Sequence, residues 1–495
     1  MNKLIYYCLF FLMSYFSSAQ SFAAESLSEA EVIQRVLQQN LDVRSQYYDP
    51  EIAKTGEKLA RSAFDTQVQG QAYYQLDQKD VQIDVFGTDN RTILYEGQAA
   101  KKFPYGVEAG VGLSNIRTST NSPFITGDQA PFSGNPRVFE TQLSFEARMN
   151  LLRNRFGKSD RAALSLAKKQ TEIVQSSTYY SVESKVYEAL VVYWRWVVAK
   201  RNLYLTRQFL IRANEFLSLT QENQRIGLTE DPDILAAKAL VAERKVSVLR
   251  AENFLKDEEK RLRYFLNLPD SVSLQPPSTL NIRVSRLKRE EMISSALQNR
   301  QDFLALNQQA EAKDIQIATA KDQKWPSLDL FSSLRLNSVD PNYGTALGET
   351  FSGQHPNWLI GAQFGLSLEN RRAKSELEKK QLEKAQLLLQ LKNAENAIVL
   401  EVDEVLRELK LQDEEVQKYH QIVALQKNKL NIEDKNYRLG RSSSDMIVRF
   451  QEDYLAAEQR RLEAKLRLKL AEVDLRRVIS NLIPPKVEAS SYETR

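Results

Sequence analysis

The sequence predicts a mixed fold, in which strands and a long helical hairpin form one unit that occurs twice in tandem. Three observations predict this fold. The two halves of the chain share matching segments in the same order, two long stretches lack proline, and shorter segments before those stretches alternate apolar and polar residues. Glycine and proline are also scarce, with 17 and 14 among 495 residues, which indicates few turns and long uninterrupted elements.

The N-terminus predicts a secretory signal peptide over residues 1–23. Lys3 supplies a positive charge, Leu4–Phe16 is an apolar run too short to span a membrane, and Ser21–Ala23 offers small residues for cleavage. A retained N-terminal anchor helix is the alternative. Cleavage would remove Cys8, the one cysteine of the chain, so the exported protein would have no thiol for disulfides, zinc binding or catalysis.

Two copies of one unit follow the signal peptide. Three segments of the first half pair with three of the second, in the same order: 26–43 with 286–303, 222–235 with 434–448, and 265–269 with 479–484. One such match could arise by chance, whereas three in order indicate a duplication. The predicted parts are a first repeat, a linker, a second repeat and a C-terminal tail, at 24–270, 271–285, 286–484 and 485–495.

Each repeat contains two segments in which apolar and polar residues alternate, as in a strand with one apolar face. These four core strands are expected at Asp65–Leu76, Val138–Met149, Ser327–Leu336 and Trp358–Leu368. The alternation fits either the wall of a membrane barrel or a soluble sandwich. Four strands cannot close a membrane barrel, which needs about eight, so several chains would have to share one. A lumen wide enough for cargo favours three chains over two.

The first repeat carries extra residues at 81–137, where the second repeat has only Asn337–Pro356. Within them, Arg91–Phe103 and Gly106–Arg117 look like one more hairpin, broken at Pro104. We expect these extra residues to form an enlarged surface loop on the outer face of the molecule.

Long helices are expected after the strands of each repeat, at about Lys158–Arg225 and Arg371–Leu439. Because a helix rises 1.5 Å per residue, roughly 70 residues make a rod of roughly 100 Å. The second rod has a mostly apolar seam with the 4-3 spacing of coiled coils, at Ile398, Val402, Val405, Leu409, Gln412, Val416, Tyr419, Val423, Gln426 and Leu430. A two-helix stalk and a cylinder of side-by-side helices both explain this seam. Apolar residues off the seam, such as Leu400 and Leu425, favour the cylinder.

Composition and motifs argue against several classes of function. The net charge of +4 is small and both signs alternate along the helices, which argues against a nucleic-acid surface. His355 and His420 lie too far apart for a metal site, and no nucleotide-binding or hydrolase motif occurs. The sequence therefore predicts no catalytic residue, cofactor or metal. The cluster of Tyr187, Tyr193, Trp194 and Trp196 on the first long helix is interpreted as packing between helices.

Each long helix turns back at a tip that is marked by glycine. The first tip is near Gly227–Asp233 and the second near Gly440–Asp445. Together with the duplicated order of strands and helical hairpins, these tips make the chain resemble the TolC family of outer-membrane export channels, from about Leu27 to Pro484. The resemblance implies a homotrimer, with a twelve-strand barrel in the lipid of the outer membrane and a twelve-helix tunnel projecting into the periplasm.

The resemblance also implies a passive exit duct of an efflux or type I secretion system. An inner-membrane pump would pass small molecules or proteins through a periplasmic adaptor (a membrane fusion protein) into the tunnel. Gly227 and Gly440 match the positions that contact the adaptor, although each also suits a helix that ends in the left-handed conformation. The residues that the resemblance implies for the periplasmic gate are Asp233, Tyr437, Arg441 and Asp445. Arg441 and Asp445 match the family only with a one-residue gap after Gly440, and a solvated surface charge is the alternative for Arg441.

Two other classes of protein are also alternatives for this sequence. A secreted or periplasmic coiled-coil structural or adhesion protein with a small β head would have the same long helices. A periplasmic adaptor also has a helical hairpin, but a duplication with two tips argues against that class.

Overall fold

A computed structural model describes residues 27–80, 88–122, 137–277 and 288–483. The chain divides into two compact units. The sheet unit comprises Asp49–Ser176 and Phe303–Asn393, and the helical unit comprises Met1–Tyr48, Ser177–Asp302 and Ala394–Arg495. The predicted signal peptide, the predicted tail and part of the predicted linker lie outside the described residues.

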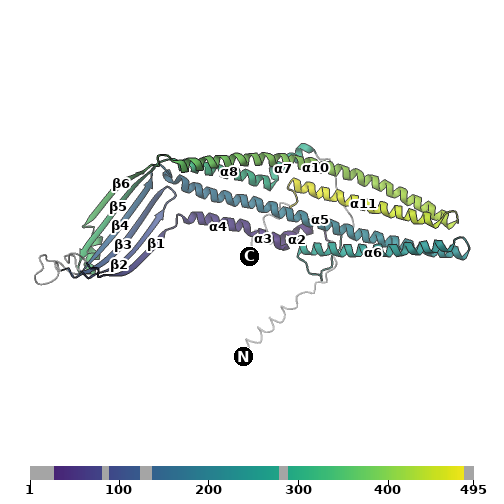
Figure 1. Cartoon of the computed structure of the whole chain (residues 1–495), viewed down its shortest axis with the longest axis horizontal. Coiled ribbons are helices and arrows are strands. Elements are labelled where there is room, and N and C mark those ends of the chain that lie inside the picture. The colour runs from purple at the N-terminus through teal and green to yellow at the C-terminus, as the bar shows by residue number, and fades with distance from the viewer. Residues whose placement is uncertain (1–26, 81–87, 123–136, 278–287, 484–495) are drawn as a thin grey trace, which may run out of the picture. The chain divides into compact units, whose positions relative to one another are not determined.

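The described residues of the sheet unit form six antiparallel strands (Figure 1). In chain order the strands are β1 (Gln67–Asp77), β2 (Asn90–Lys102), β3 (Val107–Thr120), β4 (Arg137–Asn150), β5 (Ser327–Asp340) and β6 (Pro356–Gly365). Each strand pairs with the next one in the chain, so β1 and β6 are the two edges of the sheet. The four predicted strand segments correspond to β1, β4, β5 and β6.

The prediction of four core strands per chain is wrong. The further hairpin expected within the extra residues is present as β2 and β3, but it lies inside the sheet between β1 and β4 instead of in a loop. The second repeat has no equivalent hairpin, which is why the comparison of repeats favoured a loop. The register shows instead that the hairpin continues the sheet. Ile93 lies opposite Tyr74 and Tyr95 opposite Ala72, so the alternating residues of β2 and β1 project to the same face.

The sheet has one mainly apolar and one mainly polar face. Residues directly opposite each other in paired strands project to the same face, so the register assigns each side chain to a face. The apolar face carries Val68, Ala72, Tyr74, Ile93, Tyr95, Val111, Leu113, Leu143, Phe145, Leu330, Leu334, Trp358, Ile360 and Phe364. The polar face carries Gln69, Gln71, Glu96, Gln98, Ser114, Gln142, Ser144, Arg335 and Asn357. The predicted alternation is confirmed, and it extends over all six strands.

Four of the six strands connect directly to helices (Figure 1). The helix α4 (Tyr48–Ser62) leads into β1 and α8 (Gln301–Asp322) into β5, whereas α5 (Lys158–Arg225) follows β4 and α10 (Arg371–Arg438) follows β6. A short 3-10 turn, η2 (Arg155–Gly157), precedes α5. The remaining helix of the sheet unit, α9 (Tyr343–Ser352), connects β5 to β6 and packs on β4 and β5.

The turn between β2 and β3 packs against the joint between β4 and α5. Lys102 forms an ion pair of 2.9 Å with Asp160, and Arg161 donates a hydrogen bond of 3.1 Å to the carbonyl of Pro104. Gly106 and Gly157 lie in contact there, with φ angles of +78° and +71° that favour glycine. These contacts anchor the hairpin at its base.

The described residues of the helical unit form the rest of α5 and α10 and five further helices. These are α2 (Glu29–Gln39), α3 (Leu41–Gln46), α6 (Asp231–Leu266), α7 (Arg289–Asn299) and α11 (Ser444–Val478). The predicted long helices correspond to α5 and α10, which each have 68 residues. No helix in the described ranges combines the length and the apolar character needed to cross a membrane.

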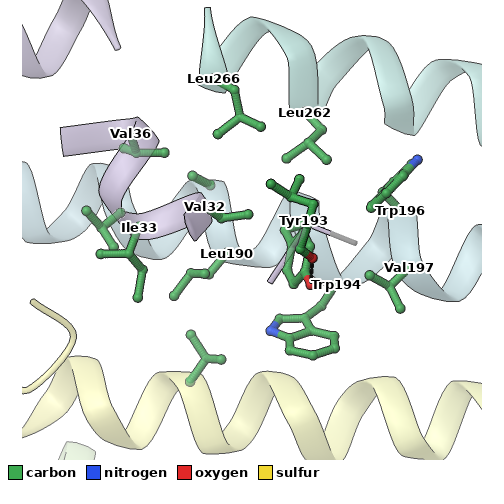
Figure 2. Packing of buried hydrophobic residues seen from close by; sticks show 14 of the residues in the cluster. Val32, Ile33, Val36, Leu190, Tyr193, Trp194, Trp196, Val197, Leu262 and Leu266 are labelled. Carbon is green, nitrogen blue, oxygen red and sulfur yellow. Dashed lines mark hydrogen bonds between the residues drawn. The ribbon is translucent and has the colours of Figure 1, made fainter. Parts of the chain in front are cut away.

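The core of the helical unit packs α2 against α5 and α6 (Figure 2). Ser28 and Glu31 form a capping box that begins α2, and Val32 and Val36 then project into the core. Tyr193 is fully buried, and its hydroxyl donates a hydrogen bond of 2.7 Å to the carbonyl of Leu27. The neighbouring tryptophans are buried in the same cluster, so the interpretation of these aromatic residues as packing is confirmed.

The predicted seam of α10 is largely buried within the chain. Ile398, Val402 and Leu409 are each at most 4% exposed. Leu400 and Leu425, which lie off the seam, are 57% and 69% exposed. One apolar face of α10 is thus covered within the chain, whereas apolar side chains away from it face outwards.

Candidate functional site

The two helical tips have the same backbone geometry. After α5, Gly227 adopts a φ of +76° and the N–H of Leu228 donates a hydrogen bond of 2.9 Å to the carbonyl of Asn223. After α10, Gly440 adopts a φ of +70° and the N–H of Arg441 donates an equivalent bond of 2.9 Å, five residues back. This is the Schellman pattern, in which glycine accepts the left-handed conformation without a Cβ clash. Both glycines therefore end their helices as predicted.

The two tips also contact each other. A Cβ at Gly440 would lie 3.7 Å from a methyl carbon of Leu228, which is ordinary van der Waals contact. Around this contact lies an exposed apolar group, which we call the tip patch and define as Ile226, Leu228 and Leu439. These side chains are 51–66% exposed, which is unusual for neighbouring large apolar residues at a polar helix end.

Tyr437 is the most buried of the predicted gate residues. It is 1% exposed, and its hydroxyl lies 3.0 Å from the hydroxyls of both Thr220 and Ser444. Its ring packs 5.3 Å from that of Phe216. Because these partners belong to α5 and α11, Tyr437 connects three helices of the two hairpins. Neither Thr220 nor Ser444 was predicted as its partner, since a lone hydroxyl residue on a long helix carries no distinctive pattern.

The structure does not bring the other three predicted gate residues into contact with Tyr437. The carboxylate of Asp233 accepts a hydrogen bond of 3.1 Å from the backbone N–H of Glu230 and so caps the start of α6. Arg441 and Asp445 are exposed, and neither forms an ion pair within the described residues. Arg441 and Asp445 are thus accessible to another molecule at the tips, whereas Asp233 is partly buried in its cap.

Comparison with known proteins gives one consistent result. The family model of outer membrane efflux proteins matches residues 292–481. Over 306 residues the chain is 22% identical to the probable efflux pump outer membrane protein TtgC of Pseudomonas putida, covering 62% of this chain and 61% of that protein. A crystal structure of CusC has a TM-score of 0.67 at 12% identity, over 91% of both chains. The crystal structure of the CmeC outer membrane channel of Campylobacter jejuni has a TM-score of 0.65 at 14% sequence identity, over 96% of this chain and 94% of that one. Residues 292–481 of this chain belong to the outer membrane efflux protein family, and the fold of the chain is similar to that of outer-membrane channels.

These matches confirm the resemblance of the sequence to TolC-like outer-membrane efflux proteins. The matched segment contains the second tip, with Tyr437, Gly440, Arg441 and Asp445. The alignment spans about 61% of the length of the curated relatives.

A buried ionic cluster in the helical unit of this protein was not predicted. Arg300 pairs with Asp302 at 2.8 Å and also with Glu401, which receives a second ion pair from Arg477. The side chain of Arg300 is only 9% exposed. Burial by itself would raise the pKa of Glu401, but the hydrogen bonds from the two arginines outweigh it and lower that pKa. The cluster therefore links α7, α8, α10 and α11. Each of its four charged side chains has a partner of opposite charge.

Glu183 lies beside this cluster, on α5, and is 2% exposed. Its carboxylate accepts hydrogen bonds from the hydroxyl of Ser480 at 2.6 Å and the N–H of Leu482 at 3.3 Å. Burial raises the pKa of Glu183 in spite of these bonds. A carboxyl whose pKa is higher in the folded state binds its proton more tightly there, so its contribution to stability is present at low pH and is lost as the pH rises through the folded pKa.

Replacing Glu183 by glutamine is expected to remove that pH dependence. The amide oxygen can keep the hydrogen bond from the N–H of Leu482, and the amide NH2 can donate to the hydroxyl oxygen of Ser480, without the cost of a buried charge. The melting temperature of Glu183→Gln should match that of the wild type below about pH 4 and exceed it increasingly above that pH, by a few degrees at neutrality. Tryptophan fluorescence during heating at a series of pH values measures this. The exposed Glu290→Gln is the control, and a difference that does not change with pH would contradict the prediction.

Proposed function

We propose that this protein is the outer-membrane exit duct of a tripartite efflux pump. Three copies would share a β-barrel in the membrane and join their helices into a periplasmic tunnel. Cargo would arrive from an inner-membrane pump through a periplasmic adaptor. The observation that carries the proposal is a sheet with one apolar and one polar face whose strands run directly into helices of 68 residues.

The edges of the sheet support sharing between copies. An unpaired edge cannot face lipid, because its N–H and C=O groups would lose their hydrogen bonds. β1 and β6 are such edges in a single chain. Because the sheet has an even number of antiparallel strands, its first and last strands run in opposite directions. The β6 of one copy can therefore pair with the β1 of the next in the same antiparallel pattern, and the ring closes.

The tip patch and the neighbouring Gly227 and Gly440 support the binding of an adaptor at the periplasmic end. Gly227 has no other atom within 4 Å of a Cβ position, so a partner's backbone can approach it closely. The surrounding apolar side chains of the tip patch provide area that an adaptor tip would cover. In this proposal Asp233, Arg441 and Asp445 face the neighbouring copies of the trimer and close the duct with Tyr437 until the adaptor binds.

Reconstitution in planar lipid bilayers tests the proposed channel. Purified protein should insert spontaneously and give discrete conductance steps of uniform size. The heat-denatured protein at the same concentration is the control for detergent artefacts. If the native protein gave no steps at all, the channel function would be rejected.

Loosening the tip should change the time that the channel spends open. Tyr437→Phe removes two hydroxyl contacts and leaves the buried Ser444 hydroxyl without that partner, at a cost of about 1 kcal/mol. If this contact stabilises the closed tip, the ratio of open to closed time rises about fivefold. Adding Asp233→Ala should raise it further. Single-channel recording measures both variants, with Tyr419→Phe, a partly exposed tyrosine of the same helix, as the control. Unchanged open times would mean that these residues do not gate.

A further inference from the structure

We infer that the hairpin of β2 and β3 is part of the membrane wall, so that three copies close a barrel of eighteen strands instead of twelve. The inference rests on the proposed trimeric channel and concerns how wide its outer-membrane section is. It departs from the resemblance described above, which implies four strands from each copy.

The side chains of the hairpin fit a membrane wall. On the apolar face, Tyr95, Val111 and Leu113 are 59%, 41% and 38% exposed. The register places them beside Ala72 of β1 and beside Phe145 and Leu143 of β4. An aqueous loop would expose polar side chains on both faces, whereas a barrel strand needs apolar side chains towards lipid.

The opposite face of the hairpin is polar along the same length. Glu96 lies opposite Gln71, and Gln98 lies opposite Gln69 with a hydrogen bond of 3.0 Å between their amides. On the other side, Ser114 lies opposite Gln142. The division into faces therefore continues from β1 through the hairpin to β4 over Tyr95–Ala99 and Val111–Ser114, as in a wall between lipid and a water-filled lumen. Beyond that segment, Asn115 and Arg117 place polar side chains on the apolar face.

The strands of the hairpin are also long enough to cross a membrane. β2 has 13 residues and β3 has 14, compared with 11 in β1 and 14 in β4. A tilted strand crosses the hydrocarbon layer with about 9–11 residues. The turn at the base of the hairpin is bound to the joint between β4 and α5 by the Lys102–Asp160 ion pair and by the glycine contact. The hairpin thus begins at the level where the neighbouring strands pass into helices.

The width of the sheet matches that of the helices that it meets. Strands about 4.8 Å apart with a tilt of about 40° each occupy about 6.3 Å of circumference, so six occupy about 38 Å. Four helices packed 8–10 Å apart occupy about 32–40 Å. Four strands would cover only about 25 Å at that tilt. Six strands therefore meet the four helices that adjoin the base of the sheet, α4, α5, α8 and α10, without a change in circumference.

A barrel of eighteen strands is also wider. With the same spacing and tilt, the backbone diameter is about 36 Å for eighteen strands and about 24 Å for twelve. The hairpin, which the second repeat lacks, would therefore set the bore of the outer-membrane section.

Cysteine labelling in intact outer-membrane vesicles tests the placement of the hairpin. Every variant carries Cys8→Ser, so that each has one introduced thiol. On the hairpin, Tyr95→Cys and Leu113→Cys probe the apolar face, and Gln98→Cys and Ser114→Cys probe the polar face. Matched controls on the flanking strands are Tyr74→Cys and Leu143→Cys against Gln69→Cys and Gln142→Cys. The probe is a small charged maleimide that does not cross lipid.

We expect the polar-face thiols of the hairpin to react at least about tenfold faster than the apolar-face thiols, because a thiol in hydrocarbon neither ionises nor meets the probe. All variants should react equally after denaturation. If the controls show this contrast and the hairpin does not, the hairpin is outside the membrane and the inference is overturned while the channel stands. If the controls also show no contrast, the proposed membrane wall itself fails. Native mass spectrometry gives the number of copies, and any number other than three overturns the count of eighteen.

Discussion

Replacing Gly157 by alanine is expected to prevent the sheet unit from assembling at the joint between β4 and α5. A Cβ at Gly157 would lie 2.1 Å from the carbonyl oxygen of Pro104 and 2.7 Å from the backbone nitrogen of Gly106. Both contacts are with backbone, which cannot move aside as a flexible side chain does. The φ of +71° adds a strain of about 1–2 kcal/mol for a residue with a Cβ. The β2–β3 turn and the joint cannot both keep their positions.

The measurement is the share of the protein that reaches the outer membrane in a form resistant to trypsin. For Gly157→Ala we expect a reduction of about tenfold or more, because a loss beyond 1.4 kcal/mol already changes a folding equilibrium by a factor of ten. Gly353→Ala is a matched control. Gly353 has a similar φ of +74° in the same unit, but an added Cβ there meets nothing within 4 Å. Its variant carries the backbone strain without the clash and should assemble nearly normally. Equal behaviour of the two variants would contradict the argument from steric contact.

Replacing Arg300 by methionine is expected to destabilise the helical unit by about 3 kcal/mol, at the lower end of the range for breaking a buried ion pair. The loss arises mainly because Asp302 and Glu401 would keep their charges without this partner. Glu401 would retain Arg477, which limits the cost. The lowered pKa of Glu401 shows that the cluster favours its charged form.

Thermal unfolding, followed by tryptophan fluorescence, measures this effect as a fall in melting temperature of several degrees. Lys288→Met is the matched control. Lys288 pairs with Glu291 at 2.8 Å, but the two side chains are 77% and 60% exposed, so solvent screens the interaction and the change should be within about 1 kcal/mol. A similar melting temperature for both variants would show that the cluster around Arg300 does not stabilise the fold.

Several elements could be predicted from the sequence because their signals are local. The absence of proline and glycine over 68 residues predicts α5 and α10, whatever they pack against. The glycines at 227 and 440 mark both tips, since each turn needs a left-handed residue at that place. The alternation in β1 and β4 predicts strands with one apolar face, because side chains project to opposite faces with a period of two. The resemblance to TolC-like channels followed from the order of these elements.

Other features depend on residues that are distant in the sequence. Arg300 and Glu401 are 101 residues apart, and Thr220 and Tyr437 are 217 apart, so no spacing in the chain indicates that they meet. The hairpin of β2 and β3 illustrates the same limit. Its alternation could be seen in the sequence. Whether a hairpin joins a sheet depends, however, on a neighbouring strand that has an unpaired edge of similar length and the same order of apolar and polar side chains.

The sequence by itself determined the length of the helices, the position of the tips and the resemblance to TolC-like channels, because periodicity and turn residues act within a few positions of each other. Only the tertiary structure decided that the sheet has six strands, that Tyr437 binds Thr220 and Ser444, and that a buried ionic cluster holds the helices together. Those features arise from pairing and packing between distant segments, where partners are selected by register, shape and charge in three dimensions.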